Sequence, residues 1–276
     1  MPELPEVETV RRDIAPQVTG RRIARAEVGP GPRYGSLADA AGRTIRQVDR
    51  RGKYLLFDLD DRELIINLGM SGRLFMAGSP PEDGHLRAVI QLDGPGAGYL
   101  VFVDMRKFGT LAIVRPGEYH AIPTLAAMGP EPLSDQFAFE PFCDAVAGGG
   151  TPIKALLLSQ KAVAGLGNIY VDEALNRAGI HPAARGVSRK RALVLHQAIR
   201  DVLEEAIANR GTTFSLYRDG YMREGNHYAD LRVYDRAGKP CPACRTPIEK
   251  TRVAQRGTYF CPNCQPISRL TAAGRS

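Results

Sequence analysis

The segment CPACRTPIEKTRVAQRGTYFCPNC, residues 241–264, decides the C-terminal part of the fold, because it places four cysteines in two C-x-x-C pairs. Close pairs at this separation form the two knuckles of a four-thiolate zinc site, in which thiolates fill every coordination position. Since no position stays open for a substrate, the sequence predicts one structural Zn2+. Its four ligands would be Cys241, Cys244, Cys261 and Cys264.

The residues between the two cysteine pairs predict a β-hairpin with a polar, basic surface. Its polar residues are Lys250, Arg252, Gln255, Arg256 and Thr258. Such a hairpin tip could hold phosphates, or it could be a basic hairpin that only water contacts. The hairpin residues by themselves leave both interpretations open.

The composition outside this segment is that of an ordinary globular protein. The chain has 276 residues, of which 43% are hydrophobic and 24% charged, which excludes disorder of the whole chain and allows two or three cores. No apolar run approaches the roughly 20 residues that span a bilayer. The start, MPELPEVETV, carries acids where a signal peptide needs basic residues, so we expect a soluble, cytoplasmic protein.

The formal net charge of +7 favours an acidic polymer such as nucleic acid as the partner. A merely basic soluble protein fits the charge equally well.

Four of the five cysteines lie in the close pairs, which is typical of a metal site in a reducing cytosol. The fifth, Cys143, follows Phe142 in an apolar stretch and is expected to pack as a small hydrophobic residue.

The N-terminal part of the chain changes from a helical to a β pattern. Leu4, Val7, Val10 and Ile14 recur at helical spacing, which predicts an amphipathic helix over residues 3–15. Short β-rich runs separated by turn residues follow between residues 20 and 115. These runs cover residues 54–57, 64–66, 88–90 and 99–103. The pattern predicts a β-sandwich or barrel with a helix packed against it.

The remainder of the chain is predicted to be helical until the cysteine segment begins. Residues 116–132 are interpreted as a linker, and tight turns are expected at 165–168 and 179–182. Helices are expected over residues 137–147, 152–159, 169–178 and 188–209. Residues 211–230 show no periodicity and indicate a long functional or mobile loop. The last residues, 265–276, are expected to fray.

The chain start offers an unusual nucleophile. Removal of Met1 before the small residue Pro2 would expose a secondary amine. The pKa of a chain-terminal amine is about 8, against about 10.4 for lysine, so far more of it is neutral at pH 7. Attack on a sugar C1′ would give an iminium cation, with Glu3 beside it as acid or base. Many proteins start with these residues, so they identify nothing alone.

Six motifs along the chain together resemble bacterial formamidopyrimidine-DNA glycosylases. They are, in order, MPELPEVETV at the start, RGKY at 51–54, LGMSG at 68–72, DMRKFG at 104–109, GLGNIY at 165–170 and the four-cysteine segment. The resemblance extends from Pro2 to about Gln265. It implies an α+β multidomain fold: an N-terminal β-sandwich with its leading helix, a helix–two-turn–helix domain and a C-terminal four-cysteine zinc finger. The implied boundaries are 2–120 for the catalytic β-sandwich domain and 132–210 for the helix–two-turn–helix domain. A lesion-recognition loop and connection would cover 211–235, the zinc finger 236–266 and a flexible tail 267–276.

The resemblance implies a monomeric, nucleoid-associated enzyme of base excision repair. Its members are bifunctional glycosylases and apurinic/apyrimidinic lyases that remove 8-oxoguanine and formamidopyrimidines from duplex DNA, with β,δ-elimination. By its place in the motif, Pro2 would be the Schiff-base nucleophile and Glu3 the proton donor for sugar ring opening. Glu6 also matches a position near the site, although an acid in the first turn of a helix has a structural explanation as well.

Further residues acquire expected roles from the same resemblance. Lys53 would hold a phosphate and support catalysis, as would Arg256 from the finger. Met70 would fill the vacated space in the duplex, Phe108 would wedge between base pairs and Arg106 would face the orphaned base, which offsets the cost of flipping a nucleotide. Without the resemblance, Met70 and Phe108 would be interpreted as core residues.

The remaining DNA contacts are expected from Asn168, Lys154 and His85. Asn168 and nearby backbone amides would grip phosphates together with Lys154, whereas the simpler interpretation of Asn168 is a helix cap. His85 lies in the segment His85-Leu86-Arg87, where many relatives carry two histidines. Arg87 keeps a cation there, so a phosphate contact could survive.

Two other functions stay open at this point. Endonuclease VIII-type enzymes are related but prefer oxidised pyrimidines; the PELPEVE start and the long 211–230 loop favour the purine enzyme. The interior of that loop, with Tyr221, Met222 and His227, departs from the family pattern, so the loop gives little information about which lesion is preferred.

A noncatalytic zinc-ribbon DNA-binding protein would bind in a salt-dependent way without turnover. The intact Pro2-Glu3 pair with Lys53 argues against it.

Overall fold

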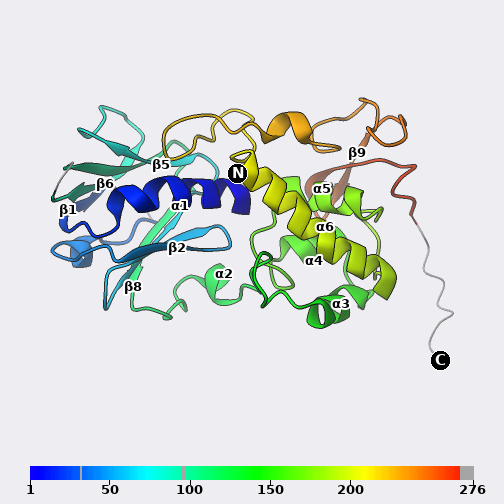
Figure 1. Cartoon of the computed structure of the whole chain (residues 1–276), viewed down its shortest axis with the longest axis horizontal. Coiled ribbons are helices and arrows are strands. Elements are labelled where there is room, and N and C mark those ends of the chain that lie inside the picture. The colour runs from blue at the N-terminus through cyan, green and yellow to red at the C-terminus, as the bar shows by residue number, and fades with distance from the viewer. Residues whose placement is uncertain (32, 95–96, 268–276) are drawn as a thin grey trace. The chain divides into compact units, whose positions relative to one another are not determined.

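The computed structural model describes residues 1–31, 33–94 and 97–267. They form two compact units, which we call the N-terminal unit (residues 1–126 and 206–228) and the C-terminal unit (127–205 and 229–276) (Figure 1). Of the tail expected at 267–276, all but Ile267 lies outside the described residues. Within the described ranges, every helix is too short or too polar to cross a membrane.

The N-terminal unit is built on two antiparallel sheets of four strands each, which confirms the predicted sandwich. One sheet has the order β1-β6-β7-β5, with bounds Ile23–Val28, Leu86–Leu92, Gly98–Asp104 and Gly72–Ala77. The other has the order β2-β3-β4-β8, with bounds Gln47–Arg51, Tyr54–Asp58, Glu63–Asn67 and Thr110–Val114. The apolar runs correspond to β3, β4, β6 and β7. The runs did not include β1, β2, β5 and β8, and in β1 and β2 only Ile23 and Val48 are buried, so neither strand carries a strong apolar signal.

Helix α1, Leu4–Val18, carries the apolar face that the sequence predicted. Figure 1 shows it beside the sandwich, and its residues Val7, Val10 and Ile14 belong to the same core as the sheets. The helix runs three residues past its expected end and through Pro16. A proline inside a helix removes the hydrogen bond of its own nitrogen and crowds the carbonyl of residue i−4. Burial of Val18 offsets part of that cost.

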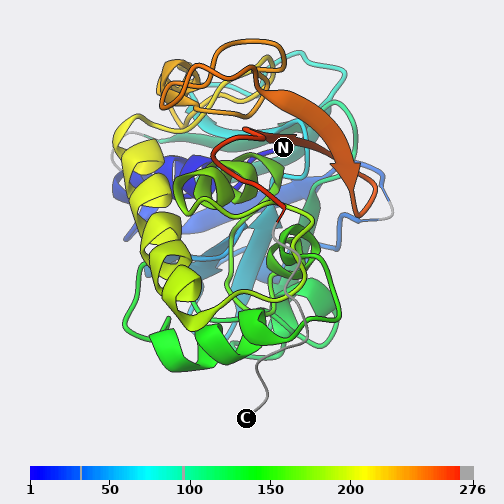
Figure 2. The ribbon, with the colours of Figure 1, turned by 90° about the vertical axis from the view of Figure 1, so that its right-hand side faces the viewer.

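The C-terminal unit contains the predicted helices and the predicted hairpin (Figure 2). The helices are α3 Phe139–Ala147, α4 Ile153–Leu158, α5 Asn168–Arg177 and α6 Arg189–Ala208, and the hairpin strands are β9 Glu249–Val253 and β10 Arg256–Phe260. The last residues of α6 belong to the N-terminal unit. Cys143 is buried beside Phe142, as expected. The linker expected at 116–132 contains one short helix that was not foreseen, α2 Pro123–Ala126.

The segment 211–230 contains no strand and no α-helix. Its regular elements are the isolated bridge between Thr212 and Asn226 and the 3-10 helix η2, His227–Asp230. Hydrogen bonds from side chains to backbone amides order the rest of it. The segment is therefore irregular, as its lack of periodicity indicated, and it has a defined set of anchors.

Candidate active site and metal centre

The first residues of the chain form a tightly capped helix start. Glu3 is the N-cap residue of α1, Pro5 lies in its first turn, and Glu3 and Glu6 form a capping box. The amide of Glu3 donates to Glu6 Oε2 over 2.8 Å. Pro2, Glu3 and Glu6 are all buried, while Met1 is 57% exposed. The positive end of the helix dipole favours the two carboxylates here, so Pro2 and Glu3 lie together in a fixed, sheltered position.

Glu6 also connects the start of α1 to the segment that begins at residue 211. Its Oε1 accepts a hydrogen bond of 2.7 Å from the amide of Thr212. Gly211 has a φ of +78°, and a Cβ there would come within 2.8 Å of Glu6 Oε1. Both carboxylate oxygens of Glu6 thus hold backbone amides, which supports the structural interpretation of this residue and adds a second anchor to it.

Lys53 lies in the turn between β2 and β3 and is mostly buried. Its carbonyl oxygen accepts a hydrogen bond of 2.9 Å from Asn67 Nδ2, and Asn67 Oδ1 accepts one of 3.0 Å from the amide of Gly69. Asn67 therefore ties the turn of Lys53 to the turn that carries Met70. Sequence reasoning missed Asn67, because nothing in the sequence shows that these two turns are neighbours.

Met70, Arg106 and Phe108 project from two turns of the sandwich. Met70 follows β4, and Arg106 and Phe108 lie between β7 and β8. Met70 is 37% exposed and Phe108 is 43% exposed, and the Arg106 guanidinium lies 4.9 Å from the centre of the Phe108 ring. The interpretation of the two apolar residues as core is wrong. Apolar side chains on tight turns that face solvent indicate a binding surface.

The fully buried carboxylate of Asp104 holds these two turns together. Its Oδ1 accepts a hydrogen bond of 2.5 Å from Ser71 Oγ, and its Oδ2 accepts one of 2.7 Å from the amide of Gly109. Tyr34 donates its hydroxyl to Oδ2 over 3.2 Å, and Ser71 Oγ in turn accepts from the amide of Arg106 over 2.9 Å. Burial, and next to it the charge of Asp104, raises the pKa of Tyr34 to about 12, so this phenol stays a donor.

The two turns also approach each other at a contact that only glycine permits. A Cβ on Gly69, whose φ is +60°, would lie 2.5 Å from the amide nitrogen of Gly109. Because the backbones meet so closely, the three projecting side chains are held on one rigid support. Asp104 and Ser71 were missed in the sequence, although both stand inside the motifs that contain Met70 and Phe108.

Arg87 does not act as a surface cation, which corrects the expected phosphate contact at this position. The residue is buried, and its Nε donates to the carbonyl oxygen of Asp104 over 3.0 Å. Its Nη1 donates to the carbonyl oxygens of Gly84 and Leu86. Hydrogen bonds to these three carbonyl oxygens keep the guanidinium buried in the N-terminal unit. His85 is exposed nearby, and its amide donates to Asp83.

In the C-terminal unit, Asn168 is the first residue of α5 and does not cap it. The N-cap is Gly167, so the helix-cap interpretation of Asn168 is wrong. Asn168 Nδ2 donates to the carbonyl oxygen of Gly257 over 2.9 Å and to the Tyr234 hydroxyl over 3.4 Å. Its Oδ1 is buried and has no hydrogen-bond partner in the described part of the chain. The side chain thus links α5 to the hairpin of the finger.

Lys154 is completely buried, which corrects the expectation that its ammonium grips a phosphate. Nζ lies 2.7 Å from Asp172 Oδ1 and 3.0 Å from the carbonyl oxygen of Gly257. The other oxygen of Asp172 accepts from the amide of Tyr259 over 2.9 Å. Burial raises the pKa of the Asp172 carboxyl, and Lys154 opposes that rise. Each buried charge is stabilised by the other. Because Lys154 bonds to Gly257 and Asp172 bonds to Tyr259, the pair positions strand β10 of the hairpin.

The four cysteines meet at one point at the base of the hairpin. Their sulfur atoms all lie within 4.8 Å of one another. Two pairs, Cys244 with Cys261 and Cys244 with Cys264, are 3.4 Å apart, and Cys241 lies 3.9 Å from Cys264. Tetrahedral zinc with Zn–S bonds of about 2.3 Å requires sulfur atoms roughly 3.8 Å apart, so the four thiolates fit one structural Zn2+.

The hairpin above this centre presents Arg256. It is the first residue of β10 and pairs with Val253 across the hairpin. The two residues at the tip, Ala254 and Gln255, both have positive φ. That geometry is typical of a tight two-residue hairpin turn. Arg256 is exposed, so its guanidinium is accessible to a ligand next to the tip.

Three family models match the chain. The formamidopyrimidine-DNA glycosylase N-terminal domain matches residues 1–111, the formamidopyrimidine-DNA glycosylase H2TH domain matches 128–218, and the zinc finger found in FPG and IleRS matches 238–267. Together these models cover most of the sandwich, helices α3 to α6 and the cysteine hairpin.

Whole-chain comparisons agree with the family models. A formamidopyrimidine-DNA glycosylase of Symbiobacterium thermophilum is 52% identical over 97% of this chain and 90% of its own length. The one from Thermus thermophilus is 46% identical over 96% of this chain and 98% of its own length.

Solved structures show the same architecture. The crystal structure of the MutM (Fpg) protein of Thermus thermophilus matches with a TM-score of 0.89 at 44% identity, over 97% of this chain and all of that one. A Lactococcus lactis Fpg variant, solved in complex with Fapy-dG containing DNA, matches with a TM-score of 0.88 at 35% identity, over 96% of this chain and all of that one. The chain therefore belongs to the formamidopyrimidine-DNA glycosylase family.

Proposed function

We propose that this chain is a bifunctional DNA glycosylase and apurinic/apyrimidinic lyase that removes oxidised purines from duplex DNA with Pro2 as the nucleophile. The observation that carries the proposal is the sheltered position of Pro2 and Glu3 at the capped start of α1. Membership of the family, and relatives solved with lesion-containing DNA, support it. Exposed Met1 is accessible to the peptidase that must free the Pro2 amine.

The proposed reaction begins when the Pro2 nitrogen attacks the sugar C1′. The glycosidic bond breaks with its electron pair on the base, which takes up a proton and leaves. The nitrogen loses its own proton, the bond from C1′ to the ring oxygen breaks, and Glu3 donates a proton to that oxygen. The result is an iminium cation between Pro2 and C1′.

Strand cleavage follows from the electron demand of the iminium ion. Loss of a proton from C2′ expels the 3′ phosphate, and loss of a proton from C4′ of the resulting unsaturated iminium ion then expels the 5′ phosphate. Water then hydrolyses the iminium bond and restores the amine. Lys53, in its turn beside the sandwich, would hold a phosphate during these steps.

The exposed side chains of the sandwich would stabilise the opened duplex. Met70 would fill the space that the damaged nucleotide leaves, Phe108 would wedge between base pairs and Arg106 would face the orphaned base. The rigid support under these three residues supports this assignment, because a wedge has to keep its shape while it unstacks bases.

The phosphate contacts would come from both units. Arg256 at the hairpin, the backbone around Asn168 and exposed His85 are the groups proposed to hold the DNA backbone. Lys154 would act indirectly, through the hairpin that it supports. We assign chemistry to the N-terminal unit and backbone binding to the helices and the finger of the C-terminal unit.

Borohydride trapping on a duplex with 8-oxoguanine tests the nucleophile. The protein should form a stable covalent adduct with DNA through Pro2. Pro2→Gly, and a variant that retains Met1, should both lose the adduct. Pro80→Gly, which changes an exposed proline between β5 and β6, is the matched control and should trap normally. Undiminished trapping by either of the first two proteins would refute the assignment.

Matched duplexes with 8-oxoguanine or thymine glycol test the lesion class. Faster excision of 8-oxoguanine is expected. Preference for thymine glycol would instead indicate a specificity of the endonuclease VIII type, and salt-dependent binding without any cleavage would indicate a noncatalytic DNA-binding protein.

A further inference from the structure

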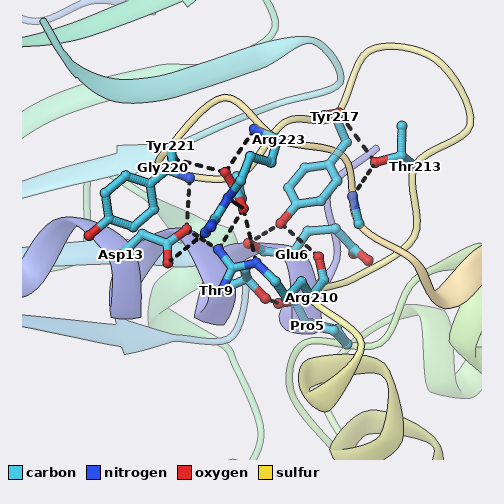
Figure 3. A network of polar contacts seen from close by, with 12 residues as sticks. Pro5, Glu6, Thr9, Asp13, Arg210, Thr213, Tyr217, Gly220, Tyr221 and Arg223 are labelled. Carbon is cyan, nitrogen blue, oxygen red and sulfur yellow. Dashed lines mark hydrogen bonds and ion pairs between the residues drawn. The ribbon is translucent and has the colours of Figure 1, made fainter.

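The segment 211–223, which we call the recognition loop, is anchored along one face of helix α1. Glu6, Thr9 and Asp13 are spaced by three and four residues, so their side chains lie on the same side of the helix. Figure 3 shows all three facing the loop. Glu6 holds Thr212, and the Tyr217 hydroxyl bonds to the carbonyl oxygens of Glu6 and Arg210. Asp13 holds the far end of the loop.

Asp13 makes its contact where the loop backbone comes closest to the helix. Its Oδ2 accepts a hydrogen bond of 3.0 Å from the amide of Gly220 and one of 2.5 Å from Arg210 Nη2. A Cβ on Gly220 would lie 2.6 Å from the Cβ of Asp13, so only glycine fits at this point of the loop. The loop therefore has to follow the helix surface here.

Asp219 organises the turn next to this contact from the inside. It is fully buried, and its Oδ1 accepts the amides of Tyr221 and Arg223, each over 2.9 Å. Its Oδ2 accepts from Arg210 Nη2 over 2.5 Å and from Arg223 Nε over 3.0 Å. One carboxylate thus closes the turn and fastens it to Arg210.

Two arginines reach both carboxylates: Arg210 lies 2.5 Å from each, and Arg223 lies 3.0 Å from Asp219 but 4.0 Å from Asp13, so Arg210 makes the closer bridge. Arg210 lies directly before the loop, has a φ of +62°, and bridges Asp13 of α1 to Asp219 of the loop. Asp13 and Asp219 would repel each other without a cation between them. The loop conformation therefore depends on a guanidinium that can reach two carboxylates at once, which a lysine ammonium does less well.

We propose that Asp13, Arg210 and Asp219 form a clamp that positions the recognition loop for excision of the damaged base, and that strand cleavage at an abasic site does not need it. The proposal rests on the proposed function. The clamp orders the loop before DNA arrives, so binding need not supply the ordering entropy.

The separation of the two activities follows from the geometry. The capping box of Glu3 and Glu6 fixes Pro2 without help from the clamp, and Asp13 lies seven residues along α1 from Glu6, about 10 Å away. Exposed apolar side chains of the loop, among them Phe214, Leu216 and Tyr221, are available to contact a base. An abasic site offers no base to contact, so loosening the loop should spare it.

The test compares Arg210→Met and Asp13→Ala on two substrates. Single-turnover excision from an 8-oxoguanine duplex should fall roughly ten- to a hundredfold, as for the loss of a hydrogen bond to a charged group. Cleavage of a preformed abasic-site duplex should stay within about twofold. Arg210→Lys should recover part of the excision rate. Arg46→Met, which removes an exposed pair with Asp60 elsewhere in the N-terminal unit, is the control and should change neither rate.

Equal losses on both substrates, or no loss of excision, would overturn the clamp. Trypsin digestion gives a readout that needs no enzymatic activity, since the loop contains Arg218 and Arg223. Asp13→Ala should be cut there faster than the wild type and the control, and unchanged cutting would also count against the clamp. Wild-type protein that cleaved neither duplex would refute the proposed function instead, and the digestion would still decide about the clamp.

Discussion

Ser71 Oγ donates a hydrogen bond of 2.5 Å to the buried carboxylate of Asp104, and this bond joins the turn of Met70 to the turn of Arg106 and Phe108. The same hydroxyl accepts the amide of Arg106. Exposed side chains usually move with their loops. Here the backbone beneath them is fixed by a carboxylate that is inaccessible to water, so the surface proposed to contact DNA is formed in advance.

Ser71→Ala should lower the free energy of unfolding by about 1.5–3 kcal/mol, because it removes a hydrogen bond to a buried charge. It should also weaken binding of lesion DNA, since the amide of Arg106 loses its acceptor. Urea unfolding and a binding titration measure the two effects. Ser79→Ala, at an exposed position, is the control. Unchanged stability would show that Asp104 does not depend on Ser71.

Phe108→Ala should reduce excision of 8-oxoguanine, while lowering stability no more than Met105→Ala does. The two side chains are about equally exposed, so both variants lose similar buried area, whereas only Phe108→Ala removes the proposed wedge. The neighbouring Met105 is 44% exposed and has no assigned role, so Met105→Ala is the matched control. Parallel measurements of excision rate and melting temperature decide the matter. Equal rates for the two variants would remove Phe108 from the wedge.

Cys244→Ser should abolish DNA binding while leaving the Pro2 amine intact. Loss of one thiolate opens the zinc site, and the hairpin that presents Arg256 loses its base. Metal analysis should show one zinc per wild-type chain and a loss in the variant. Cys143→Ala is the control and should keep both zinc and binding, because Cys143 lies in the helical part. Normal DNA binding by the zinc-free variant would refute the role of the finger.

Lys154→Met should cost roughly 3–5 kcal/mol of stability in mildly alkaline solution, where it leaves Asp172 charged and buried without its partner. Burial already raises the pKa of Asp172 to about 7, and without Lys154 nothing of equal strength opposes the rise, so the pKa in the variant lies higher still. A proton then neutralises the carboxyl of the variant above pH 7, where the wild type still holds its ion pair. The deficit of the variant should therefore shrink as pH falls from 9 toward 7 and stay constant below that, which urea unfolding between pH 9 and 5 would detect. A deficit independent of pH would contradict this account.

Glu8→Gln should flatten the acid limb of the stability curve. Burial alone would raise the pKa of Glu8, but its pairs with Arg11, Arg12 and Arg50 outweigh burial and lower the pKa to about 2. The ordinary value is 4.5, so the stabilisation is present above pH 4.5 and is lost as pH falls toward 2. Over that pH range the free energy of unfolding of the wild type should fall by up to roughly 3 kcal/mol from this source. The variant lacks the carboxylate, so it should show no such loss. Parallel acid limbs would contradict the prediction.

The sequence by itself determined the features that depend on neighbours in the chain. The zinc site follows from cysteine spacing, α1 and the long helices from apolar periodicity, and the central strands from apolar runs. The place of Pro2 behind Met1 offers a secondary amine, but its proposed role needed the six motifs that occur together along the chain. The cysteine, helix and strand signals each lie within one short segment, where spacing fixes which side chains share a face or a ligand.

Only the tertiary structure decided which side chains are buried and what they contact. Arg87 and Lys154 look like surface cations in the sequence, and both are enclosed; Met70 and Phe108 look like core, and both are exposed. Arg210 meets Asp13, which lies 197 residues away. The environment of a charge depends on segments that folding brings together from distant parts of the chain. Local patterns cannot contain that information, because burial and electrostatic partners are properties of the packed chain.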